Sequence, residues 1–307
     1  MKLTILGSSS ALPTSARNPS AHVLNVHERL YLIDCGEGTQ MQMRKYGIRI
    51  SKINHIFISH LHGDHIFGLY GLLSTFNLMG RTLPVNIYAP ENYGKILKSH
   101  LSDFDIQLSY NINFTPLKGR KPVLILDDKY LTVTAFPLKH RVPAFGFLFR
   151  EKLQDRRIKK EMISLHNIPI SKMHGIKKGE DLVKDNGTVV KNEELTIPPP
   201  EPLSYAYCSD TRFFKQLPSY VRNVSLIYHE ATFDKEKEDL AELTGHSTTT
   251  DAATVALKAG AGKLLIGHFS SRYKDVDQLV EEARSIFPET YAAEDGKTYL
   301  ITHNKIS

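Results

Sequence analysis

The sequence predicts an α/β fold. Short β-type runs alternate with helical patterns over the first 150 residues, and the same rhythm resumes over the last hundred. Several expected strands end in a histidine or an aspartate, and loops at the C-terminal ends of strands are where α/β folds usually form their sites. At 307 residues, the chain can bury a large core, in one large domain or in two smaller ones.

The expected elements follow from local patterns along the chain. Apolar or alternating runs predict strands at residues 2–6, 22–26, 30–33, 54–58, 85–89, 123–126, 130–136, 144–149, 203–208, 224–228 and 263–266. Helical spacing predicts helices at residues 37–46, 66–78, 91–101, 248–259 and 275–286. Pro90 marks the start of the third helix, and Asp127 and Asp128 form the turn of an expected hairpin.

Residues 150–200 depart from this rhythm. They are polar and basic, with ten Lys or Arg against five Asp or Glu over residues 150–184, and three consecutive prolines at 198–200. We expect an inserted, flexible arm on an otherwise continuous domain that spans residues 1–307. A disordered surface loop with a solvated run of charge is the alternative.

Composition limits the class of protein and its compartment. The net charge of +6 weakly favours a polyanionic partner. No apolar stretch approaches the roughly 20 residues of a membrane span, and the N-terminus has the pattern of a strand and turn rather than of a signal peptide. Cys35 and Cys208 are expected to be buried in strand ends without a disulfide framework. We therefore expect a cytoplasmic protein without a membrane partner.

The sequence SHLHGDH at residues 59–65 directly follows an expected apolar strand. Imidazole and carboxylate groups are ligands of zinc and similar divalent ions. One tight turn cannot direct four such groups at a single ion, so His60 and His62 are expected to reach one metal, and Asp64 and His65 a second. A two-metal site suits hydrolysis of phosphate esters or acyl bonds.

Three further ligand-type residues each follow a β-type run. With His140, Asp210 and His268 the chain offers seven ligands. One ion is expected to bind the first two histidines and His140, the other to bind Asp64, His65 and His268, and Asp210 to bridge them. The metals would activate a water as the nucleophile. Zinc, manganese, cobalt and iron all accept such ligands. Asp34, at the end of another strand, is expected to orient a ligand histidine or the histidine loop.

Several segments resemble those of tRNase Z, an endonuclease of the metallo-β-lactamase superfamily. They are LIDCGEGTQ at 32–40, SDT at 209–211, HEAT at 229–232, GHST at 245–248 and GHFSSRY at 267–273. The resemblance covers nearly the whole chain at the length of the family's short form. It implies an αββα sandwich of two mixed sheets with helices outside and an inserted exosite arm. It also implies two Zn²⁺ per subunit, with Mn²⁺ or another divalent ion possible.

The same resemblance implies an activity and roles for further residues. The family removes the 3′ trailer from precursor tRNA, leaving a 3′-hydroxyl on the tRNA and a 5′-phosphate on the trailer. Asp64, Glu230 and His246 would be the catalytic residues, with Glu230 and His246 as the proton-transfer pair at the leaving oxygen. The arm, with Lys177 and Lys178, would grip tRNA phosphates, and the family is homodimeric.

Substrate contacts are also implied at residues near the expected site. They are Arg17, Asn18, Ser247, Thr248 and Arg272. Ser15 departs from the family, because it stands where the Pro-x-Lys-x-Arg-Asn loop has a lysine; that loop monitors nucleotides near the cleavage site.

Two alternatives to a tRNA endonuclease stay open at the level of the sequence. A small-molecule metallo-hydrolase of the same superfamily would act on a thioester, a sulfate or a cyclic-nucleotide phosphodiester. Such an enzyme needs the metal ligands but no long basic arm. A non-catalytic RNA-binding scaffold would need a degenerate metal site, whereas all seven ligands are present.

Overall fold

A computed structural model describes residues 1–302 of the chain. The chain divides into two compact units. Of the described residues, one unit contains 1–150 and 203–302, and the other contains Glu151–Pro202. Among residues 1–302, no helix is long and apolar enough to cross a membrane.

The larger unit contains two seven-stranded mixed sheets. The first has the order β18 (Thr298–Leu300), β1 (Lys2–Gly7), β2 (Ala21–Val26), β3 (Arg29–Ile33), β4 (Ile53–Phe57), β5 (Val85–Pro90) and β6 (Ile112–Leu117). The second has the order β17 (Thr290–Ala292), β16 (Leu264–Gly267), β15 (Leu226–Glu230), β14 (Ser204–Cys208), β9 (Phe145–Glu151), β8 (Leu131–Pro137) and β7 (Val123–Asp127). Strands β3 to β6 run parallel, as do β14 to β17, so each parallel block ends in loops at one edge of its sheet.

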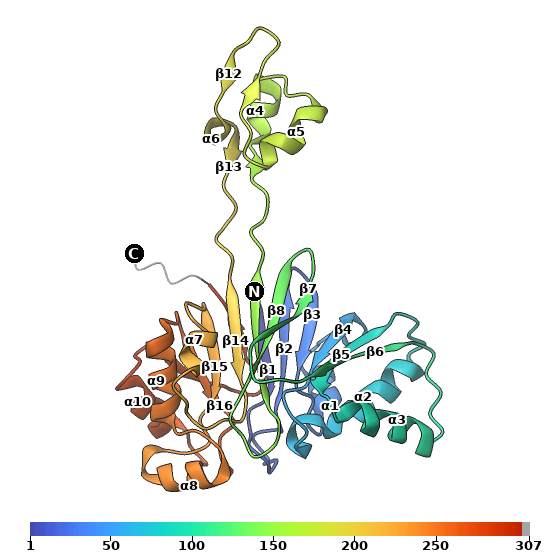
Figure 1. The fold of residues 1–307 in the computed structure, drawn as a ribbon, viewed down its shortest axis with the longest axis vertical. Helices are drawn as coiled ribbons and strands as arrows, with labels where there is room; N and C mark the ends of the chain where they lie inside the picture. The colour runs from blue at the N-terminus through green and yellow to red at the C-terminus, as the bar shows by residue number, and fades with distance from the viewer. Residues whose placement is uncertain (303–307) are drawn as a thin grey trace. The chain divides into compact units, whose positions relative to one another are not determined.

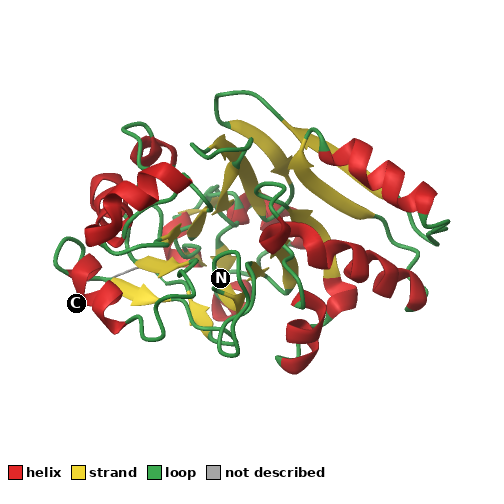
Figure 2. Ribbon diagram, turned by 90° about the horizontal axis from the view of Figure 1, so that it is seen from below, coloured by secondary structure: helices red, strands yellow, loops and turns green. Residues whose placement is uncertain are grey.

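Helices cover the outer face of each sheet (Figure 1). Against the first sheet lie α1 (Thr39–Lys45), η1 (Ile50–Lys52), α2 (Gly63–Leu78) and α3 (Tyr93–Asp103). Against the second lie α7 (Leu217–Tyr220), α9 (Thr249–Ala259) and α10 (Asp277–Arg284), with η2 (Lys235–Lys237) and α8 (Glu238–Thr244) in the connection before α9. Figure 2 shows helices flanking the strands on both sides.

Three apolar clusters hold these layers together. One lies between the two sheets and is rich in aromatic rings, among them Phe57, Phe147 and Tyr207. The other two lie between each sheet and its helices. A strand buried on both faces must be apolar along its whole length, which explains the unbroken apolar run in β16. The predicted αββα sandwich is confirmed.

The element boundaries differ from the sequence prediction in a few places. The prediction missed β6, β17, β18, α7 and α8. The three strands lie at or near sheet edges and are short or half-exposed, so their apolar pattern is weak. Strand β15 extends to Glu230, two residues beyond the predicted end, which places this carboxylate in the sheet itself.

The smaller unit has a core of its own. It contains β10 (Arg157–Ile158), α4 (Lys160–Leu165), α5 (Ile170–Lys177), β11 (Leu182–Val183), β12 (Val189–Val190), α6 (Asn192–Leu195) and β13 (Thr196–Ile197). Strand β10 pairs with β13 and β11 with β12. Its buried residues are Ile158, Ile168, Ile176, Leu182, Val190 and Leu195. The side-chain amide of Asn192 donates to the carbonyl oxygens of Ile176 and Glu180, which ties α6 to α5. No element was predicted here, because each is too short to show a period.

Candidate metal centre

Loops at the C-terminal ends of strands carry the seven predicted ligands. His60 and His62 lie between β4 and α2, and Asp64 and His65 lie in the first turn of α2. The other three follow strands of the second sheet: His140 follows β8, Asp210 follows β14 and His268 follows β16. The structure brings all seven together at one place, where both sheets present their loops.

The first group consists of His60, His62, His140 and Asp210, whose ligand atoms lie within 4.8 Å of one another. His62 Nδ1 lies 3.0 Å from His60 Nε2 and 3.3 Å from His140 Nε2. Burial is the largest of the influences that lower the pKa values of these three histidines, with His62 reaching about 4. They are therefore neutral near pH 7, which is the form that binds a metal.

The second group consists of Asp64, His65 and His268. The Nε2 atoms of the two histidines lie 3.3 Å apart, and each is 3.4 Å from Asp64 Oδ2. Burial opposes a charge on His65, but Asp64, Asp210 and Asp34 outweigh it and raise the pKa of His65 well above its usual range. The carboxylates therefore favour a cation at this position.

Asp210 lies between the two groups. Its Oδ2 is 3.4 Å from His60 Nε2, and its Oδ1 is 3.4 Å from His65 Nε2 and 3.3 Å from His268 Nε2. Oδ1 is buried and accepts no hydrogen bond from any described residue. Burial would raise the pKa of Asp210, but the surrounding histidines hold it well below its usual range. An ionised, buried oxygen that faces two imidazoles fits a ligand of a divalent metal ion.

Asp34 fixes one side of this centre. Its carboxylate accepts hydrogen bonds from Ser59 N at 2.7 Å, Ser59 Oγ at 2.8 Å and Tyr207 OH at 2.7 Å, and lies 2.7 Å from His65 Nδ1. Asp34 adopts φ 54°, in the left-handed region, a conformation that surrounding contacts must hold in place. It thus contacts both the histidine loop and the predicted ligand His65.

Glu230 and His246 form a buried pair beside the predicted metal ligands. Glu230 Oε1 lies 3.0 Å from His246 Nδ1 and accepts the backbone N–H groups of Thr211 and Ser247, while Oε2 accepts Thr232 Oγ1 at 2.8 Å. Burial would lower the pKa of His246, but Glu230 and Asp210 outweigh it and raise the pKa to about 9. The Glu230 side chain is fully buried, whereas that of His246 is 14% exposed, so only the imidazole can reach a substrate.

The donor set suits two divalent ions that share one carboxylate. Histidine nitrogens and aspartate oxygens are the ligands that zinc and similar ions take in hydrolytic sites. His246 Nδ1 also lies 3.9 Å from Asp210 Oδ2 and forms a third possible group with Asp210 and His268. Its shorter contact to Glu230 favours a role outside the metal ligands.

Comparisons with known proteins agree with this geometry. Ribonuclease Z of Bacteroides thetaiotaomicron is 42% identical over 302 residues, which cover 98% of this chain and 96% of the relative. Ribonuclease Z of Bacteroides fragilis is 44% identical over 294 residues, which cover 96% and 97%. The chain belongs to the ribonuclease Z family. The resemblance found in the sequence motifs is confirmed.

Solved structures and a family model extend the comparison. The crystal structure of human tRNase Z, short form, has a TM-score of 0.71 and 28% identity, and the match covers 98% of this chain and 100% of that one. YhfI of Bacillus subtilis, a metallo-β-lactamase fold protein, has a TM-score of 0.69 at 18% identity and covers 97% and 98%, which shows the shared fold. The family model described as anti-Pycsar protein Apyc1 matches residues 1–167, a span that ends before Asp210.

Five further residues of this ribonuclease Z family member were predicted to contact the substrate near the centre, and they form two sets. Ser247 and Thr248 are buried: Ser247 Oγ donates to the carbonyl oxygen of Thr211, and Thr248 forms a reciprocal capping box with Asp251 at the start of α9. Both hydroxyls therefore serve the loop that carries His246, and neither faces solvent.

Arg17, Asn18 and Arg272 each make hydrogen bonds that hold loops in place: Arg17 bonds to the loop after β16, Arg272 bonds within that loop, and Asn18 bonds to the turn before β18. Arg17 Nη2 donates to the Tyr273 carbonyl oxygen at 2.5 Å, and Arg272 Nε donates to Ser270 Oγ at 3.0 Å. Asn18 Nδ2 donates to Asp295. Ser15 is exposed at the tip of the first loop.

Lys177 and Lys178 lie at the end of α5 in the smaller unit, where both are exposed. Lys178 Nζ pairs with Asp155 at 2.8 Å.

Sequence reasoning missed three supporting side chains: Ser59, Tyr207 and Thr232. Thr232 Oγ1 donates to Glu230 and lies 3.0 Å from His268 Nδ1. It therefore connects the Glu230–His246 pair to a predicted metal ligand. Its place in the HEAT motif was a signal. Ser59 stands at the head of the histidine run, and nothing in the sequence near Tyr207 indicates its contact with Asp34.

Proposed function

We propose that this chain is a metal-dependent endoribonuclease that removes the 3′ trailer from tRNA precursors. The products would be a tRNA with a 3′-hydroxyl and a trailer with a 5′-phosphate. The observation that carries the proposal is the pair of donor groups joined by Asp210, with the Glu230–His246 pair directly beside them. The names of the relatives, ribonuclease Z and tRNase Z, support RNA as the substrate.

Two Zn²⁺ per subunit are the proposed cofactors, and Mn²⁺ is the alternative. The first ion would be held by His60, His62 and His140, and the second by Asp64, His65 and His268, with Asp210 shared by both. When bound, the two ions polarise the scissile phosphate and supply a nucleophilic water at neutral pH. Asp34 keeps His65 Nδ1 occupied, so that Nε2 faces the metal position.

His246 is the proposed general acid. The leaving group is a ribose 3′-oxygen with a high pKa, which leaves far more easily when it receives a proton. Glu230 outweighs burial and raises the pKa of His246, which favours the protonated imidazole, and it holds the ring through Nδ1. Such proton transfer contributes about 10²–10⁴-fold to a rate.

The smaller unit is the proposed tRNA-binding arm. Lys177, Lys178 and the other exposed cations of this unit would contact phosphates, which adds affinity without sequence readout and makes binding salt-sensitive. A homodimer, in which one subunit's arm presents tRNA to the other's centre, and a cytoplasmic location are parts of the same proposal.

The deciding experiment is a gel assay with a labelled tRNA precursor that carries a 3′ trailer, with and without chelator. A single cut near the discriminator base that vanishes with chelator and returns with zinc supports the proposal. The nucleotide position of the cut also reports how Ser15 affects site choice.

The same assay separates the competing functions. Turnover of a small ester by metal-replete protein that leaves the precursor intact would indicate a small-molecule metallo-hydrolase. Protein that binds tRNA, retains no metal after reconstitution and cuts nothing would indicate a binding scaffold.

A further inference from the structure

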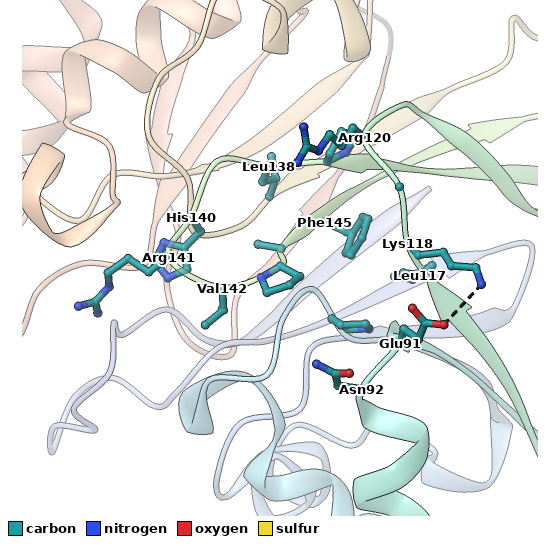
Figure 3. A pocket seen from close by; sticks show the side chains of 15 residues that line it. Glu91, Asn92, Leu117, Lys118, Arg120, Leu138, His140, Arg141, Val142 and Phe145 are labelled. Carbon is teal, nitrogen blue, oxygen red and sulfur yellow. Dashed lines mark hydrogen bonds and ion pairs between the residues drawn. The ribbon is translucent and has the colours of Figure 1, made fainter.

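A cavity of about 610 Å³ adjoins the metal centre at His140 (Figure 3). Three segments line it: residues 90–92 at the end of β5, residues 117–120 between β6 and β7, and residues 137–145 between β8 and β9. His140 belongs both to this lining and to the first donor group. The cavity therefore lies beside the first donor group, with His140 between the two.

The rim of this cavity is cationic. Lys118, Arg120 and Arg141 line it, against Glu91 alone, and in Figure 3 they stand at separate points around the apolar side chains between them. Lys118 Nζ lies 3.4 Å from Glu91 Oε1 across an exposed contact. Among the described residues, Arg120 and Arg141 have no hydrogen-bond or ion-pair partner, so their guanidinium groups are available to a ligand.

A second cavity beside the site has the opposite charge. It has a volume of about 310 Å³ and borders His246. Four carboxylates line it: Glu238, Asp239, Glu242 and Asp251. Of the two cavities, the one with the cationic rim is therefore the one that attracts the phosphates of a bound nucleic-acid strand.

We propose that the cationic cavity binds the first nucleotides of the single-stranded 3′ trailer. This inference rests on the proposed function and adds to it a site for the part of the substrate that is cut away. The cleaved bond gives its 3′-oxygen to the tRNA and its phosphate to the trailer. If His246 protonates the 3′-oxygen, the tRNA end lies on the His246 side of the scissile phosphate, and the trailer continues on the side of His140.

The apolar surface between the cations suits this ligand. Val142 lies half-exposed between the cationic rim residues, and the lining residues Leu138 and Phe145 are almost fully buried beside it. Single-stranded nucleic acid binds where cations follow the backbone and apolar or aromatic groups contact the bases, with little sequence preference. The site therefore accepts trailers of varied sequence.

The test compares the wild-type protein with the double variant Lys118→Ala/Arg120→Ala. Both residues are exposed between two strands, so their replacement leaves the core intact. Lys52→Ala is the matched control: Lys52 is an exposed cation that lines a separate cavity of about 460 Å³ at the opposite end of β4. A double charge reversal, Lys118→Glu/Arg120→Glu, changes the local charge by twice as much and should increase the effect.

Two measurements report on the cavity. The first is binding of a free 5′-phosphorylated oligonucleotide of about eight nucleotides, followed by fluorescence anisotropy over a salt series. We expect weaker binding by the double variant and a salt slope smaller by about 0.7 for each phosphate that the variant no longer neutralises. The second is kcat/KM for precursors with a trailer of one nucleotide and with the longer trailer. The variant should lose the advantage of the longer trailer, and Lys52→Ala should keep it.

Each contrary result has one meaning. Unchanged oligonucleotide binding by the double variant, or an equal loss of kcat/KM with short and long trailers, would overturn the trailer site; the equal loss would assign the cavity to the tRNA body. Failure of the wild-type protein to cut any precursor would instead overturn the proposed function, and the oligonucleotide measurement would still decide whether the cavity binds single-stranded RNA.

Discussion

The metal centre and the smaller unit use their polar side chains in opposite ways. At the centre, Asp34, His65 and Glu230 are fully buried, and each makes short contacts to other polar groups. In the smaller unit, buried apolar residues form the core, and the cations Lys177 and Lys178 lie exposed. Chemistry requires groups that are fixed in place and shielded from water, whereas phosphate binding requires cations that remain accessible.

The energetic consequences differ as well. A buried charge that loses its partner costs several kcal/mol, so a change at the centre affects its neighbours. The exposed Lys178–Asp155 pair contributes about 0–1 kcal/mol, as surface ion pairs generally do. A single substitution at the metal centre should therefore change the activity strongly. In the smaller unit, tRNA binding should weaken strongly only when several cations or the whole segment are removed.

The substitution Asp64→Ala should give the largest effect on cleavage. It removes the carboxylate of the second donor group and the acceptor of the Ala11 N–H. We expect cleavage of precursor tRNA to fall by about 10³-fold or more, as for loss of a member of a catalytic unit, with tRNA binding retained. Gel cleavage and anisotropy binding check this, with Asp103→Ala on α3 as the control. Equal loss of binding would contradict the division of roles between centre and arm.

The substitution His246→Ala should slow RNA cleavage by about 10²–10⁴-fold, because the leaving ribose oxygen loses its proton donor. Bis(p-nitrophenyl) phosphate tests the reason, since nitrophenolate leaves without a proton. Hydrolysis of this diester should fall much less than cleavage of RNA. His100→Ala, on α3, is the control for histidine removal. A matching loss with both substrates would show that His246 supports the metal ligands and does not act as the acid.

Deletion of residues 155–195 should separate the two regions directly. The deleted segment contains every buried apolar residue of the smaller unit, so no partial core remains. We expect the Kd for tRNA to rise by at least about tenfold, since several cations that neutralise phosphates are removed, while hydrolysis of the small diester is retained. Lys177→Ala/Lys178→Ala should reproduce part of this weakening in an intact unit. Unchanged processing of precursor tRNA by the deletion variant would show that this unit is not the tRNA-binding arm.

The sequence indicated the candidate metal ligands more fully than the side chains that hold those ligands in place. His60, Asp210 and His268 were found because each follows an apolar run, and parallel strands end at a common edge. The contact between Asp34 and Tyr207 could not be predicted from such patterns. Asp34 follows β3 of the first sheet and Tyr207 belongs to β14 of the second, so their contact depends on how the two sheets pack. The elements of the smaller unit, such as β10 with Ile158 and β11 with Leu182, were missed because they are only two to eight residues long and show no apolar period.

The substitution Tyr207→Phe tests this unpredicted contact and should give the smallest effect. It removes the hydrogen bond from the Tyr207 hydroxyl to Asp34 Oδ2, which leaves Ser59 and His65 to hold the carboxylate. Loss of an outer partner of a metal ligand costs about 10–100-fold in metal affinity or activity; we expect the lower end, because two contacts to the same oxygen remain. Competition with a chelator measures the metal affinity. Tyr205→Phe is a matched control, since Tyr205 lies on the same strand and contacts His22. If both variants lose stability alike and neither changes metal affinity, Tyr207 serves only the core between the sheets, and the precise placement of the centre depends on Asp34 and its loop alone.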